Sequence, residues 1–68
     1  MFFYDSNTLK VGNYMRILSL KENEIILLMK SNEKLEIKGL NLVISFYDKE
    51  EVIIEGRINS IRIIYENN

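Results

Sequence analysis

Short runs of isoleucine and other apolar residues, separated by polar pairs, recur along almost the whole 68-residue chain. The eleven isoleucines are Ile17, Ile25, Ile26, Ile37, Ile44, Ile53, Ile54, Ile58, Ile61, Ile63 and Ile64. Branching at Cβ restricts χ1 in a helix, whereas such side chains pack well on a pleated sheet. The sequence therefore predicts an all-β fold, with a small, meandering antiparallel sheet that is sandwich-like or a partly closed barrel.

The expected strands are bounded by polar turns in which Asn or Asp can hold turn conformations. They cover residues 2–4, 8–11, 16–20, 24–30, 34–38, 40–46, 51–57 and 60–65. A chain of this length admits one domain, so we expect residues 1–68 to form a single all-β domain. Within it, residues 1–13 form an N-terminal strand or arm.

The hairpin around the second polar turn has two alternative registers. A two-residue turn would pair Leu28 with Leu35, whereas a three-residue loop at residues 31–33 would place Met29 beside Leu35. A slip of one residue exchanges the buried and exposed faces of a strand. The three-residue loop exposes less apolar area, so it is the register that we predict.

One buried face does not use all the apolar side chains of these strands. Val52, Ile54 and Ile58 form one inward set, and Ile61, Ile63 and Tyr65 form another. The apolar residues left on the opposite faces are Ile26, Leu28, Val43, Ile53 and Ile64. A contiguous exposed apolar patch usually marks an interface, and a small domain has few residues for a second packed layer. We therefore predict that these five residues dock a protein partner or a second copy, and we expect the protein to form a homo-oligomer.

The composition excludes several classes of site. Cysteine and histidine are both absent, so the chain lacks thiolate and imidazole metal ligands and a histidine to activate a serine. Nine Lys and Arg face ten Asp and Glu, which disfavours general nucleic-acid binding. We expect no catalytic residue, no cofactor and no metal.

Neither the apolar runs nor the N-terminus points to a membrane or to secretion. The longest uncharged apolar run, residues 25–29, is far shorter than the roughly 20 residues that cross a bilayer. Residues 1–5 lack the basic region and cleavage site of a secretory signal. We therefore expect a cytoplasmic protein without direct membrane insertion.

Gly39 and Gly56 are the glycines with a predicted structural role. Neither lies in a glycine run that could hold a phosphate. We expect a positive-φ turn at Gly39 and a bulge or bend at Gly56. The acidic residues around Asp48 are expected to form a solvated hairpin turn, since a calcium site needs about six to eight oxygen ligands.

Three stretches of the sequence, taken in order, resemble the YabP/YqfC family of sporulation proteins. They are RILSLKENEIIL from Arg16, LEIKGLNLVI from Leu35 and EEVIIEGRINSI from Glu50. The resemblance covers roughly residues 9–65. It implies a non-catalytic accessory role in spore envelope, cortex or coat assembly in the mother cell. It also implies a partner that is a membrane-bound sporulation protein, which could recruit the chain to a membrane.

The alternative is an Sm-like small β-barrel that binds RNA. Such proteins have about this length, but they need a helix before the first strand and a basic, ring-forming surface. Residues 1–13 contain no convincing helix. An enzyme is the third option, and no spacing of nucleophile and base in the sequence favours it.

Overall fold

The computed structural model describes residues 2–4 and 7–65, and all the strands it describes belong to one antiparallel sheet. The strands are β1 (Phe2–Tyr4), β2 (Thr8–Gly12), β3 (Tyr14–Leu20), β4 (Glu24–Met29), β5 (Lys34–Tyr47) and β6 (Glu51–Ile64). Their order is β1-β2-β6-β5-β4-β3, and the sheet is not closed into a barrel. The all-β prediction is confirmed. The predicted N-terminal arm contributes β1 and β2, and its residues 1, 5 and 6 lie outside the described residues.

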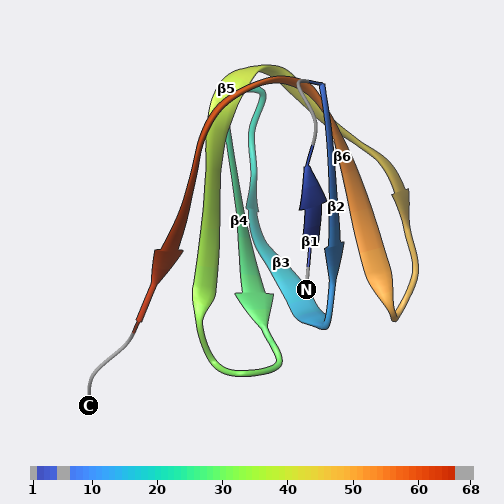
Figure 1. Ribbon diagram of the computed structural model, residues 1–68, viewed down its shortest axis with the longest axis vertical. Helices are drawn as coiled ribbons and strands as arrows, with labels where there is room; N and C mark the ends of the chain where they lie inside the picture. Colours follow the sequence, from blue (N-terminus) through green and yellow to red (C-terminus); the bar gives the residue numbers. More distant parts are fainter. Residues whose placement is uncertain (1, 5–6, 66–68) are drawn as a thin grey trace.

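The sheet is folded into two facing layers because β5 and β6 bend together (Figure 1). β2 pairs with residues 51–55 of β6, and β4 pairs with residues 34–38 of β5. The first layer, called the β2 layer, therefore contains β1, β2, the first half of β6 and the second half of β5. The second, called the β4 layer, contains β3, β4, the first half of β5 and the second half of β6.

Side chains from both layers form one apolar core. The buried residues are Leu9, Val11, Tyr14, Ile25, Leu27, Leu35, Ile37, Leu42, Val52, Ile54 and Ile58. The inward set of Val52, Ile54 and Ile58 is confirmed. In the other expected inward set, Ile61 is half-buried, whereas Ile63 is 43% exposed and Tyr65 is 66% exposed. The core thus ends before the C-terminal end of β6.

Two glycines allow the long strands to bend without breaking. The β5–β6 pairing shifts register between Lys38 and Gly39, where a Cβ on Gly39 would lie 2.0 Å from the Arg57 carbonyl oxygen. Gly56 has a φ of 136°, and a Cβ there would lie 2.7 Å from the Asn41 carbonyl oxygen.

The predicted bend at Gly56 therefore exists, but the positive-φ turn expected at Gly39 was wrong. Gly39 lies inside β5, and close backbone approach is what excludes a side chain there. Because the glycines bend the chain without ending a strand, the expected strands 34–38 and 40–46 form the single strand β5. The expected strands 51–57 and 60–65 likewise form the single strand β6, which ends at Ile64.

The β4–β5 hairpin has the predicted loop length but a different register. Leu27 pairs with Leu35, and the Met29 N–H donates to the Glu33 carbonyl at 2.8 Å, which leaves residues 30–32 as the loop. Asn32 has a φ of 71°. A three-residue hairpin loop needs one left-handed residue, and Asn adopts that conformation more readily than the Glu33 of the predicted loop. The faces are as predicted, because the pairing moved by two residues.

A tyrosine and an aspartate fix the β5–β6 turn. The buried Tyr14 hydroxyl donates to the Asp48 carbonyl at 2.5 Å. The Asp48 Oδ1 atom accepts the Glu50 and Glu51 N–H groups at 2.8 and 2.9 Å. Hydrogen bonds from Glu51 and then Glu50 lower the pKa of Asp48. Burial, followed by the charge of Asp48, raises the pKa of Tyr14. The expected solvated acidic turn is therefore held by its own backbone amides.

We predict that Asp48→Asn makes stability less dependent on acidic pH. Because folding lowers the Asp48 pKa, its carboxylate stabilises the fold above its unfolded pKa of about 3.9, and this contribution is lost as the pH falls through the folded pKa. The difference in unfolding free energy between wild type and Asp48→Asn should shrink from about pH 5 downwards. Urea unfolding at several pH values measures it, with Glu50→Gln as the control. A difference that stays constant with pH would contradict the prediction.

Candidate functional site

Large apolar side chains are exposed most densely on the second half of β5. Among the described residues, the exposed large hydrophobic side chains are Met15, Leu18, Leu20, Leu40, Val43, Phe46, Tyr47, Ile63 and Tyr65. Four of these nine belong to residues 40–47, a stretch without any charged residue. Contiguous exposed apolar surface of this kind commonly marks a binding site.

This half of β5 is exposed because its second neighbour ends early. β4 covers residues 34–38 only. The β3–β4 turn covers the bend, where the Gly39 N–H donates to the Asn23 carbonyl at 3.1 Å and the Leu42 N–H donates to the Glu22 carbonyl at 2.7 Å. From Val43 to Tyr47, β5 pairs with β6 on one side and with no other described strand.

An apolar groove of ≈ 620 Å³ lies between this edge of β5 and strand β3. Its lining residues are Ile17, Leu20, Lys21, Glu22, Leu42, Val43, Ile44 and Tyr47. Leu20 is 57% exposed and Tyr47 is 66% exposed, so the apolar wall is open to solvent. Lys21 and Glu22 are the charged residues of its lining.

The same strand also presents apolar side chains on its outer face. Ile44 and Tyr47 pair with the buried Ile54 and Val52 and share their inward face. Because successive paired positions alternate between faces, Val43 and Phe46 point outward. The exposed apolar side chains on the two faces of this edge are together called the β5 surface. It consists of Leu20, Leu40, Val43, Phe46 and Tyr47.

The structure divides the five predicted interface residues between two outer faces. Val43 and Ile53 lie on the outer face of the β2 layer, where Ile53 pairs with Phe46. Val43 is 54% exposed.

Ile26, Leu28 and Ile64 lie on the outer face of the β4 layer and are half-buried. They alternate there with charged residues, and the Glu36 carboxylate lies 3.1 Å from Arg62. The five residues therefore do not make one continuous patch.

Sequence reasoning missed four residues of the β5 surface: Leu40, Phe46, Tyr47 and Leu20. The signal for the first three was present, since residues 40–47 form the uncharged stretch of β5. Leu20 had no such signal, because its exposure depends on the gap between β3 and the second half of β5.

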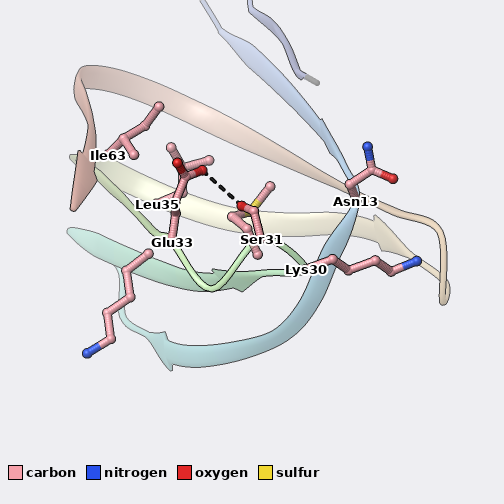
Figure 2. A pocket seen from close by; sticks show the side chains of 8 residues that line it. Asn13, Lys30, Ser31, Glu33, Leu35 and Ile63 are labelled. Carbon is pink, nitrogen blue, oxygen red and sulfur yellow. Dashed lines mark hydrogen bonds between the residues drawn. The ribbon is translucent and has the colours of Figure 1, made fainter. Parts of the chain in front are cut away.

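A second groove, of ≈ 480 Å³, lies at the end of the β4 layer and is called the terminal groove (Figure 2). Met29, Leu35 and Ile63 provide its apolar part, and the β4–β5 loop provides its polar rim. Figure 2 shows Ser31 directed towards Glu33, to which its hydroxyl donates at 2.9 Å. The polar rim is thus partly satisfied within the loop itself.

The described residues form neither a metal-binding cluster nor a membrane-crossing helix. Over residues 2–4 and 7–65, no group of three His, Cys, Asp or Glu side chains is placed to hold a metal ion. In the same part of the chain, no helix is long and apolar enough to cross a membrane. The exposed features that the structure does bring together are apolar ones.

A protein-family model, that of the YabP family, matches residues 1–68. The chain belongs to the YabP family. The resemblance noted from the sequence is therefore confirmed, and YabP-family membership indicates a sporulation-related protein. No curated protein matches the chain. None of these findings supports the Sm-like alternative for this YabP-family chain.

Proposed function

We propose that this YabP-family protein is a non-catalytic binding module in the assembly of the spore envelope, cortex or coat in the mother cell. Its β5 surface docks a protein partner. The observation that carries the proposal is the concentration of exposed apolar side chains on the uncharged second half of β5. Family membership supports the sporulation context.

The β5 surface has the composition of an interface centre. Phe46 and Tyr47 are aromatic, and aromatic residues are enriched among those that dominate binding energy. Residues 40–47 contain no charge that docking would have to desolvate. Lys21 and Glu22 lie at the groove, where they provide the polar rim that surrounds such centres.

The partner that we propose is a membrane-bound sporulation protein. The family resemblance supports this choice, and the apolar groove offers a site for an apolar segment of that protein. Docking would recruit the chain from the cytoplasm of the mother cell to a membrane. Fractionation of sporulating cells with and without an intact β5 surface tests this recruitment.

We predict that Phe46→Asp abolishes the function while the domain stays folded. Phe46 is 47% exposed, so a charge there is tolerated by the fold but not by an apolar interface. Loss of one aromatic anchor typically costs about 2 kcal/mol or more of binding, roughly 30-fold in affinity. The measurement is the number of heat-resistant spores, together with titration of the partner recovered from the membrane fraction.

Asn32→Asp is the matched control, because it adds one negative charge at an exposed loop position that Asp can also occupy with positive φ. Normal sporulation with Phe46→Asp would contradict the proposal. An equal defect with Asn32→Asp would also contradict it, since the effect would then follow net charge and not the β5 surface.

A further inference from the structure

Residues 60–64 of β6 form an edge of the β4 layer that pairs with β5 and with no other described strand. β2 pairs with residues 51–55 only, and the Gly56 N–H then donates to the Asn7 carbonyl at 3.1 Å. Beyond this point, β6 has β5 on one side and no described strand on the other. Figure 1 shows this last part of β6, in red, at the outer edge of the sheet. Residues 60–64 pair with residues 34–38 without any register shift, so this edge is regular.

The alternation of the ladder identifies the backbone groups that face outward. Hydrogen-bonded and non-hydrogen-bonded pairs alternate along antiparallel strands. The bond from the Met29 N–H to the Glu33 carbonyl fixes that alternation for β5. The backbone N–H and C=O groups of Leu35 and Ile37 point towards β4, and those of Glu36 point towards β6. On β6, the N–H and C=O groups of Ile61 and Ile63 consequently point away from β5, towards the unpaired side.

The side chains along this edge define what can pair with it. Ile61 and Ile63 alternate on the inward face, where Ile63 is 43% exposed and lines the terminal groove. Tyr65, which is 66% exposed, follows β6 and continues the same alternation in the sequence. On the outer face, the Arg62 guanidinium lies 3.1 Å from the Glu36 carboxylate. A matching strand must be apolar at alternate inward positions and must not bring a cation opposite Arg62.

We infer that a second copy of the chain pairs with this edge, antiparallel, about a twofold axis at Ile63. β6 itself carries the required alternation. In this register Ile63 meets its own equivalent, Ile61 meets Tyr65 of the second copy, and Arg62 meets Ile64. An axis at Arg62 would place the two guanidinium groups opposite one another, so charge disfavours that register. An axis at Ile61 would place Ile63 opposite Asn59, whereas the axis at Ile63 keeps apolar residues opposite one another. The pairing joins two β4 layers into one continuous sheet and covers exposed apolar residues of the terminal groove.

Pairing with a second copy at this edge stabilises a domain of this size. A chain of about 60 residues buries a smaller fraction of its surface than a larger domain, and a twofold contact repeats every gain in both copies. β3, the other edge of this layer, has register shifts at Met15 and Leu18 that disturb edge pairing, whereas residues 60–64 of β6 have none.

Sedimentation equilibrium of the purified full chain, from micromolar to millimolar concentration, tests the inference. Wild type should form dimers, and Ile63→Lys should weaken dimerisation by about 100-fold, because an inward lysine protects an edge strand and occurs in both copies. Leu18→Lys is the matched control. Leu18 is 41% exposed and lies on the other edge of the same layer, so this variant should dimerise like wild type.

A chemically synthesised chain with an N-methyl group on Ile63 keeps the side chain and removes only the outward-facing donor. It should be monomeric with a wild-type circular dichroism spectrum, and it decides the question if Ile63→Lys fails to fold. A wild-type chain that stays monomeric overturns the inference, as do a dimeric N-methyl variant and a monomeric Leu18→Lys. Phe46→Asp should leave the dimer intact, so failure of self-association is distinguishable from failure of the proposed function.

Discussion

Gly39→Ala is expected to destabilise the fold strongly. The new Cβ would lie 2.0 Å from the Arg57 carbonyl oxygen, which belongs to backbone and cannot move aside as a flexible side chain could. Overpacking of this severity costs about 3 kcal/mol or more. A domain of 68 residues has a total stability of about 3–10 kcal/mol, so the loss is a large part of it.

Urea unfolding followed by circular dichroism measures the effect of Gly39→Ala. Asn59→Ala is the control, because Asn59 is an exposed residue of β6 at the same bend and its replacement should change stability by less than about 0.5 kcal/mol. If Gly39→Ala unfolded at the wild-type urea concentration, the two strands would have room to separate at the bend, and the close approach would not be needed.

Leu27→Ala is expected to cost about 2–5 kcal/mol of unfolding free energy. Leu27 is fully buried and pairs with Leu35 within the β4 layer, so its truncation leaves a cavity that the two facing layers cannot easily fill. The same urea titration measures it. Leu18→Ala removes the same atoms from a side chain that is 41% exposed and should cost clearly less. Equal costs for the two variants would mean that the core does not lie where the structure places it.

The β4–β5 hairpin shows how far alternation alone determines a sheet. Alternation placed Leu27 and Leu35 on one buried face correctly, because moving a register by two residues leaves every face unchanged. It could not place the loop. That depended on which residue adopts the left-handed conformation, and Asn32 adopts it more cheaply than Glu33.

The bend of β5 and β6 was harder to predict from the sequence. Gly39 and Gly56 were recognised as structural, yet a glycine between two strands and a glycine inside one bent strand have the same local pattern. The difference lies in contacts across the hairpin, between Gly39 and Arg57 and between Gly56 and Asn41. Those contacts join residues that are far apart in the sequence.

The candidate site could be predicted only in part for a related reason. Which apolar residues point outward follows from alternation, and Val43 was placed correctly on an exposed face. Which of them stay uncovered depends on where the neighbouring strands end. The pairing of β5 with β4 extends only as far as Lys38, so Phe46 and Tyr47 lie beyond it and are exposed. Ile26 and Leu28 lie within β4 itself and are half-buried.

The pairing of β2 with β6 sets the order in which a newly synthesised chain can fold. Thr8 pairs with Glu55, whereas β3, β4 and β5 each pair with the next strand in the sequence. Translation at about 5–20 residues per second makes β6 several seconds after β2. During this interval the apolar Leu9 and Val11 lack their native partners. The N-terminal strands are thus the last to dock, and the nascent chain is most prone to aggregate before β6 becomes available for pairing.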